Sequence, residues 1–155
     1  MSSTPIRIDG IGTRKDGSGG ESVNFADYKR FVKLFASEAL AAGDSVCIDF
    51  TTSTSGLGNH VKKATVGASA TTCAIGVAAE ACASGDLVRI QVSGIVKIAD
   101  IDNTDDNPGD ALGAGGTAGR FTLAVAGQTA CAVLVTEGTP GNKNSTVYLL
   151  NPANL

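Results

Sequence analysis

Tryptophan is absent from this chain of 155 residues, and histidine and methionine occur once each. Aromatic residues make up only 5% of the sequence, so we expect neither a large aromatic core nor a stacking platform for bases or sugars. Charged residues account for 17%, and no apolar run reaches the ~18 residues that a membrane-spanning helix needs. The polar first residues do not resemble a signal peptide, so we expect synthesis in a cytoplasm and no membrane partner.

Each recognised catalytic template lacks a residue that it needs. His60 is the only histidine, and it follows Gly-Leu-Gly-Asn in a segment predicted to be a loop, which leaves little basis for a Ser-His-Asp or Cys-His pair. No Gly-Lys-Ser or Gly-Lys-Thr phosphate loop occurs, and the glycines of residues 113–119 have the wrong spacing for dinucleotide binding. We therefore expect a protein that is not an enzyme and that uses no cofactor.

Neither the cysteines nor the acidic residues have the spacing of a known metal site. Cys47, Cys73, Cys82 and Cys131 lie among apolar or small residues and are predicted to be buried thiols that pack as small hydrophobic groups. Residues 100–107 are rich in Asp and Asn, but they lack the glycine and the glutamate of a calcium-binding EF-hand loop. The sequence predicts a solvated loop tip there and no metal site, and it leaves cation binding by Asp100 to Asp106 open.

Charge is distributed unevenly along the chain. The net charge is −3, and no basic stripe of the kind that neutralises phosphates is present, so no nucleic-acid partner is expected. Half of the 12 Lys and Arg residues nevertheless fall within the first 33 positions. Either this basic beginning or the acidic middle of the chain offers an electrostatic contact to a partner.

The stretch from residue 72 to 99 is the clearest β-type pattern. Val88, Ile90 and Val92 alternate with Arg89, Gln91 and Ser93, which predicts a half-buried strand that follows a small-residue turn. The turn ends in Gly-Asp, and similar Gly-Asp turns precede apolar runs at residues 40–50 and 107–112. Glycine suits the positive φ of a tight turn, and Asp bonds nearby backbone groups. The chain is therefore predicted to use one turn three times.

These features predict an all-β fold, a small barrel or sandwich of about eight or nine short strands. They include a hairpin at residues 72–99 and, after a long loop region at 100–119, late strands at 120–125, 130–136 and 146–150. Residues 1–24 are polar and glycine-rich and are predicted to form an extended arm, followed by a single β domain at 25–155. At most one short helix is expected, starting near Phe25 and leading into a strand at residues 31–36. Four of the seven aromatic residues lie within residues 24–40, which we call the aromatic window. Core packing is favoured for these aromatic residues over a subunit contact.

Residues 74–96, with the Gly-Asp segments at 40–46 and 107–112, resemble small virion proteins of tailed bacteriophages. These are the capsid decoration, cement or head-stabilisation proteins, and the likeness extends over residues 36–136. The resemblance implies a compact β protein on the outer surface of the virion, commonly a homotrimer, that clamps subunits of the major capsid protein. It implies no catalysis and no cofactor.

In this interpretation the arm and the aromatic window bind the capsid while aliphatic faces form the trimer. A strand of the arm could add to a capsid sheet through backbone hydrogen bonds. The predicted capsid-binding residues are Ile6, Arg7, Ile8, Arg14, Lys15, Phe25 and Tyr28.

Two alternatives stay open. One is a receptor- or glycan-binding module of a head fibre or tail, which would use the hydroxyl-rich segment 51–59. The other is a small trimeric β hydrolase with a shared active site. The host, the lattice position and the copy number do not follow from the sequence.

Overall fold

The computed structural model describes residues 29–51, 58–66, 73–102 and 106–150, together with the backbone of two short strands at 13–15 and 21–23. All regular elements in these ranges are strands, so the predicted all-β class is confirmed. Nine of the strands form one sheet: β3 (Arg30–Ala36), β4 (Ser45–Ile48), β5 (His60–Lys63), β6 (Gly76–Ala78), β7 (Leu87–Ala99), β8 (Ala111–Ala114), β9 (Phe121–Leu123), β10 (Ala132–Thr136) and β11 (Ser145–Leu149).

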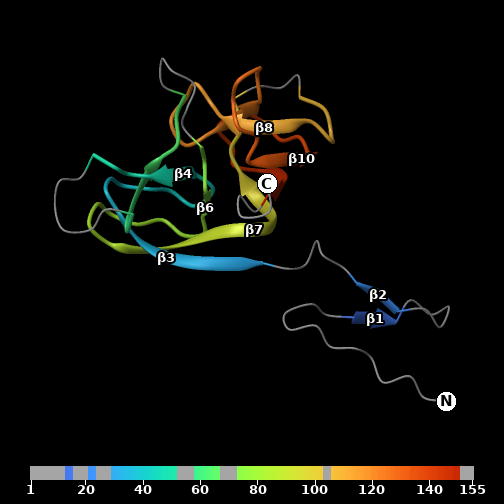
Figure 1. Ribbon diagram of the computed structural model, residues 1–155, viewed down its shortest axis with the longest axis horizontal. Coiled ribbons are helices and arrows are strands. Elements are labelled where there is room, and N and C mark those ends of the chain that lie inside the picture. The colour runs from blue at the N-terminus through green and yellow to red at the C-terminus, as the bar shows by residue number, and fades with distance from the viewer. Residues whose placement is uncertain are drawn as a thin grey trace.

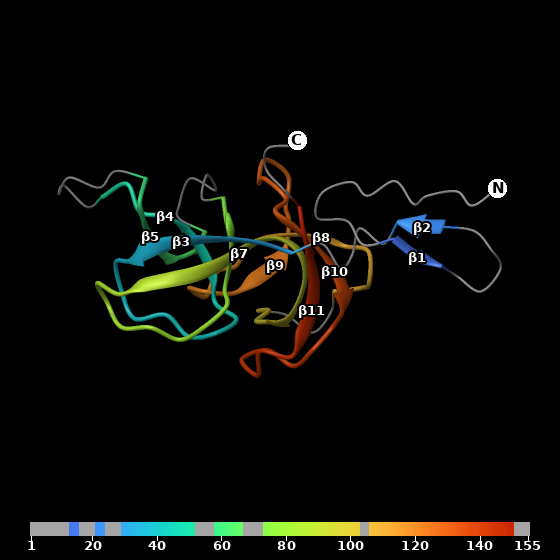
Figure 2. The same ribbon diagram turned by 90° about the horizontal axis from the view of Figure 1, so that it is seen from below.

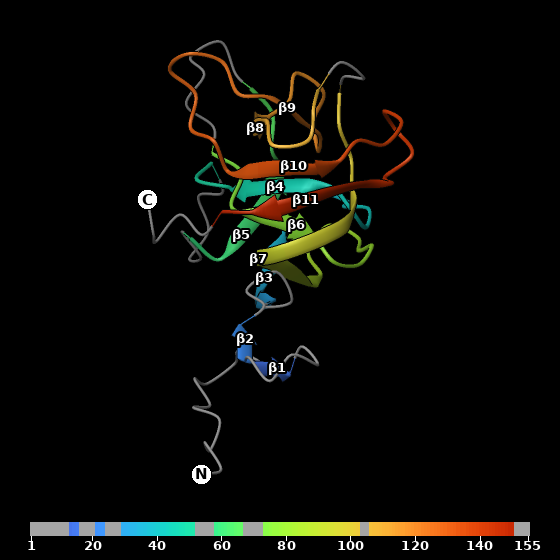
Figure 3. The same cartoon turned by 90° about the vertical axis from the view of Figure 1, so that its right-hand side faces the viewer.

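The strands β1 (Thr13–Lys15) and β2 (Glu21–Val23) pair only with each other, as an antiparallel hairpin inside the segment predicted to be an arm. Figure 3 shows this hairpin apart from the nine-stranded body. In the part of the chain with described structure, no helix is long and apolar enough to cross a membrane.

The first half of the sheet closes on itself. β3 pairs with β5 in parallel, and the ring continues through antiparallel pairs of β5 with β4, β4 with β6, β6 with β7, and β7 with β3. The second half is an antiparallel sheet in the order β7, β11, β10, β8, β9. A parallel bridge pairs Phe121 of β9 with Ile101, which follows β7 in the chain. This bridge joins the far edge of the second half, β9, to the continuation of β7. Both halves are therefore barrel-like.

The long strand β7 belongs to both halves, which Figures 1 and 2 show as two groups of strands with β7 running between them. Its residues up to Ser93 pair with β3 and β6, whereas Gly94 and the residues after it pair with β11. Gly94 has a φ of 87°, a value that glycine adopts readily and other residues rarely do. The change of partner therefore coincides with a glycine in the left-handed region.

The predicted alternation of β7 is correct only in its first part. Val88 and Ile90 are fully buried and Arg89 is exposed, as expected. Gln91 and Ser93, predicted to face solvent, are buried instead. The Gln91 side-chain amide donates hydrogen bonds to the Ser93 and Ile95 carbonyl oxygens, at 3.1 and 3.0 Å, on either side of Gly94. The buried amide satisfies backbone groups where the strand changes partner.

Two apolar clusters fill the two halves, and both are mainly aliphatic, as the composition predicts. The smaller cluster lies inside the closed ring and includes Val46, Val61, Val88 and Ile90. The larger cluster is mainly in the second half but also includes Cys47 of β4 and Val77 of β6. It contains Phe121, which is the one fully buried aromatic residue among those described.

The repeated Gly-Asp turn is confirmed in all three places. Gly43, Gly85 and Gly109 have φ values of 92°, 89° and 99°. In each turn the aspartate carboxylate accepts a hydrogen bond from the backbone N–H three residues earlier, at 2.7–3.0 Å. Its own N–H donates to the carbonyl of that same residue. The second residue after each aspartate is a fully buried Val46, Val88 or Leu112, so the turn sets the register of the strand that follows.

Other expectations need correction. Residues 100–119 were expected to be loop, yet they contain β8, whose small residues Ala-Leu-Gly-Ala give little β signal. Phe31 and Phe35 do not pack in the core, because they lie on the outer face of β3 with 42% and 43% of their surface exposed. Phe25 and Tyr28, and with them the expected helical turn, lie outside the described residues.

The Gly-Asp turns provide a matched pair of substitutions. A Cβ at Gly85 would meet no atom within 4 Å, whereas a Cβ at Gly43 would overlap the carbonyl oxygen of Ile98 in β7. Both substitutions place alanine at a positive φ. We therefore expect Gly85→Ala to lower the free energy of unfolding by about 1–2 kcal/mol. We expect Gly43→Ala to lower it by at least about 4 kcal/mol, because backbone must also move.

Urea unfolding of the two variants, followed by circular dichroism, measures this difference. Equal losses of stability for Gly43→Ala and Gly85→Ala would contradict the close packing of the first turn against β7.

Candidate functional site

His60 and the acidic residues of the stretch 100–107 are the sequence features best suited to catalysis or ion binding, and the structure shows contacts for both. His60 is the first residue of β5 rather than a loop residue, and its ring stacks on Phe35 with 5.5 Å between the ring centroids. Asp100 is buried, accepts a hydrogen bond from the Gly141 N–H and forms an ion pair with Arg120. Asp102 accepts the Thr117 N–H and also contacts Arg120.

The predicted solvated loop tip is therefore wrong for Asp100 and Asp106, because both are buried. Asp100 joins its own segment to those of Arg120 and Gly141 instead of presenting a ligand to solvent. Among the residues that the structure describes, no group of three or more His, Cys, Asp or Glu side chains could hold a metal ion.

The four cysteines are all free, but only two of them are buried as predicted. Cys47 and Cys131 are buried, whereas Cys73 and Cys82 are half-buried. Burial raises the pKa of Cys131 to about 12 and raises the pKa of Cys47 and Cys73 as well. A high pKa keeps these thiols protonated, so they pack as small hydrophobic groups and are poor nucleophiles.

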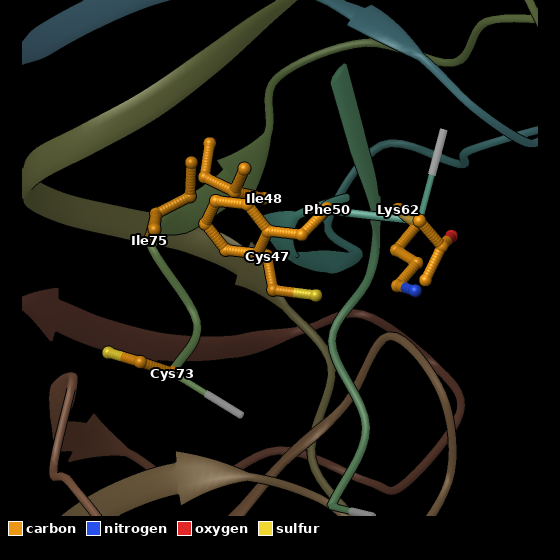
Figure 4. A pocket seen from close by; sticks show the side chains of 7 residues that line it. Cys47, Ile48, Phe50, Lys62, Cys73 and Ile75 are labelled. Carbon is orange, nitrogen blue, oxygen red and sulfur yellow. The ribbon is translucent and has the colours of Figure 1, made fainter. Parts of the chain in front are cut away.

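A cleft of about 470 Å³ opens beside β4 and β5, and Figure 4 shows the side chains that line it. Most of the lining is apolar. The lining residues are Cys47, Ile48, Phe50, Thr51, Lys62, Cys73 and Ile75. The ammonium group of Lys62 is 3.2 Å from an Asp49 carboxylate oxygen. The cleft therefore has apolar walls and one cation that is already paired.

Asp49 is held in its charged form at the edge of this cleft. Its carboxylate accepts a hydrogen bond from the Thr51 hydroxyl at 2.6 Å and another from the Thr51 N–H at 3.0 Å. These hydrogen bonds lower the pKa of Asp49 well below its ordinary value, and the ion pair with Lys62 acts in the same direction. Of the segment 51–59, which the glycan-binding alternative would use, residues 52–57 lie outside the described residues.

The second candidate is the outer surface of β3 and the first part of β7, which we call the β3–β7 face. Phe31, Lys33 and Phe35 alternate with inward residues along β3, and all three are exposed. Across the antiparallel pairing, Lys33 lies opposite Arg89 and Phe35 lies opposite Leu87, which has 51% of its surface exposed. Beside them is a shallow hollow of about 230 Å³ whose lining includes Lys29, Phe31, Arg89, Lys97 and Ile98.

The cations divide sharply between this region and the remainder of the body. Four of the nine described Lys and Arg residues form ion pairs with aspartates, and none of the four lies on β3 or β7: Lys62, Lys63, Arg120 and Lys143. The other five are exposed and form no ion pair with a described carboxylate: Lys29, Arg30, Lys33, Arg89 and Lys97. All five lie on β3 or β7 or immediately before β3.

The centre of the β3–β7 face carries an unfavourable pairing. Lys33 and Arg89 are directly opposed cations, an arrangement that destabilises an antiparallel pair. The Arg89 guanidinium is partly compensated, because it lies over the Phe31 ring at 5.0 Å from the centroid. Exposed apolar rings that alternate with cations lacking a partner among the described carboxylates indicate a contact surface more than a solvated sheet face.

The structure locates few of the residues predicted to bind the capsid. Ile6, Arg7, Ile8, Phe25 and Tyr28 lie outside the described residues. Arg14 and Lys15 are on β1, opposite Ser22 and Glu21 of β2, where only the backbone is described.

Sequence reasoning missed the β3–β7 face. The available signal was the period-two spacing of Phe31, Lys33 and Phe35, which matches a strand face better than a helical stripe.

Comparison with known proteins bears on the fold. No family model matches the chain. No curated protein matches it. Among solved structures, the chain is similar to one described as the crystal structure of the head fiber gp8.5 N base in bacteriophage phi29. The two are 17% identical with a TM-score of 0.54, and the match covers 79% of this chain and 95% of that one. At this identity the likeness establishes a shared fold.

The lowered pKa of Asp49 predicts a pH dependence of stability. A depressed folded-state pKa means that the carboxylate stabilises the fold above its unfolded-state pKa of about 3.9 and that this contribution is lost as the pH falls below that value. Asparagine cannot titrate, so Asp49→Asn should unfold more easily at pH 7 and lose less stability than wild type between about pH 5 and pH 2.

Urea unfolding across that pH range measures this effect. Thr51→Val, which removes the main hydroxyl donor, should flatten the profile in the same direction. A slope for Asp49→Asn as steep as that of wild type would show that another carboxylate is responsible.

The opposed cations predict a stabilising charge reversal. Lys33→Glu converts the Lys33–Arg89 repulsion into a cross-strand ion pair, so the free energy of unfolding should rise by about 0.2–1 kcal/mol. The same substitution in an Arg89→Gln background should give no gain. A double-mutant cycle by thermal or urea unfolding measures the coupling, and a stability loss on Lys33→Glu alone would contradict it.

Proposed function

We propose that this chain is a structural protein of a bacteriophage head, made in the host cytoplasm and carried on the outer surface of the virion. The observation that carries the proposal is the fold shared with the head fiber base of bacteriophage phi29 over 79% of the chain. The sequence of residues 36–136 resembles capsid decoration proteins, which also favours a component of the bacteriophage virion. Such a role requires a durable contact surface and no active site.

The first form of the proposal is capsid decoration. The chain binds subunits of the major capsid protein, as a homotrimer, and stabilises the lattice by bridging them. Many weak contacts repeated over a lattice give durable attachment through avidity. The exposed β3–β7 face supports this form, because it offers apolar side chains together with cations that pair with no described carboxylate.

The second form is the base of a head fibre, and the similarity to the gp8.5 base favours it specifically. In this form the chain attaches an appendage to the head instead of covering the lattice. Both forms place the chain on the head exterior in contact with capsid protein. They differ in copy number and in whether a fibre extends from it.

Mass spectrometry of purified particles tests the shared claim. The chain should remain with gradient-purified, nuclease-treated phage heads at a fixed ratio to the major capsid protein, whereas host cytoplasmic proteins should be depleted. A ratio close to that of a lattice component favours decoration, and a much smaller one favours a fibre base. Absence of the chain from the particles would contradict both forms.

Light scattering coupled to size-exclusion chromatography tests the trimer. The purified chain has a mass of 15.5 kDa, so a homotrimer would have three times that mass. A monomer that stays monomeric at high concentration would contradict trimer formation before binding.

A further inference from the structure

We propose that the β3–β7 face is the docking surface of this protein and that its occupant is a protein surface carrying carboxylates around an apolar patch. The identity of that partner as a capsid subunit rests on the proposed function. The chemistry of the partner follows from the face itself.

The apolar part of the face is substantial for a chain so poor in aromatic residues. Phe31, Phe35, Leu87 and Ile98 each expose between 40% and 51% of their surface. Phe35 and Leu87 are cross-strand partners, and Phe31 and Ile98 line the same shallow hollow. Burying such neighbouring groups against a partner removes apolar surface from water, which is the main favourable term in protein association.

The charges define the partner further. Lys33 and Arg89 are opposed at the centre of the face, while Lys29 and Lys97 line the adjoining hollow. None of these four cations is paired with a described carboxylate, although Lys62, Lys63, Arg120 and Lys143 all are. Carboxylates from a partner would relieve the central repulsion and complete the ion pairs. Complementary potentials of this kind give specificity and fast association.

A protein partner fits this face better than a nucleic acid. Single-stranded nucleic acids bind by stacking bases on exposed aromatic rings. Here the Phe31 ring is already in contact with the Arg89 guanidinium, and the Phe35 ring is already stacked on His60. The remaining exposed groups, Leu87 and Ile98, are aliphatic side chains that provide no stacking surface.

Lys33→Glu is the sharpest test, because it is expected to keep or raise stability while reversing the charge at the centre of the face. Its matched control is Ala126→Glu combined with Thr129→Glu. The control also changes the net charge by two units, at exposed positions between β9 and β10 in the other half of the body. Leu87→Ser tests the apolar part separately.

The assay is co-sedimentation with capsids assembled from the major capsid protein of the phage that encodes this chain. Wild type and the control should bind equally, and their affinity should fall as salt is raised from about 0.05 to 0.5 M. Lys33→Glu should weaken binding about tenfold or more, with a smaller salt dependence, and Leu87→Ser should weaken it with an unchanged salt dependence.

The outcomes separate the two proposals. Failure of wild type to bind capsids would overturn the proposed function. Binding by wild type with equal binding by Lys33→Glu would overturn the docking face and leave the function standing. If Lys33→Glu changed the oligomeric state of the protein and left capsid binding unchanged, the docking face would be overturned in favour of a contact between copies of this chain. If Lys33→Glu lost affinity for a mixed-sequence oligonucleotide, measured by fluorescence anisotropy, and bound capsids as well as wild type does, the docking face would be overturned in favour of a nucleic-acid site.

Discussion

The bend of β7 is the constraint on which the rest of the structure depends. One strand of 13 residues supplies a wall to the closed ring of β3 to β7 and an edge to the sheet of β8 to β11. It does both because Gly94 adopts a φ of 87° and because the Gln91 amide satisfies carbonyl groups on either side of it. The continuous backbone of β7 therefore contributes residues to both apolar clusters and connects the two halves.

The first Gly-Asp turn reinforces the same junction from the other side. Gly43 lies against the Ile98 carbonyl of β7, and its N–H donates to the Ala78 carbonyl. The buried Asp44 carboxylate caps its own turn and also pairs with Lys63 of the first half and Lys143 near the start of β11. The corresponding turn at Asp86 is exposed to solvent, and its backbone hydrogen bonds reach only Ala36 of β3, within the first half. Location decides whether this local motif also joins the two halves.

Local patterns predicted most of the fold. The Gly-Asp turns, the hairpin of β6 with β7, and the late strands β9, β10 and β11 follow from alternation and turn residues that act within a few positions. The strand β8 escaped prediction because Ala and Gly carry little β signal, and the burial of Gln91 because it depends on the partner change at Gly94. The closing pair of β3 with β7 joins residues more than fifty positions apart, which no local pattern encodes.

The candidate site was harder to predict for the same reason. Core packing was favoured for the aromatic window, and only the register of Lys33 with Arg89 and of Phe35 with Leu87 reveals an outward face.

A cryo-EM reconstruction of the intact virion would show directly where this chain lies and which face it turns to the capsid. We expect density for this body on the outside of the head, with the β3–β7 face against capsid protein. A head without that density, or with that face turned to solvent, would contradict this expectation.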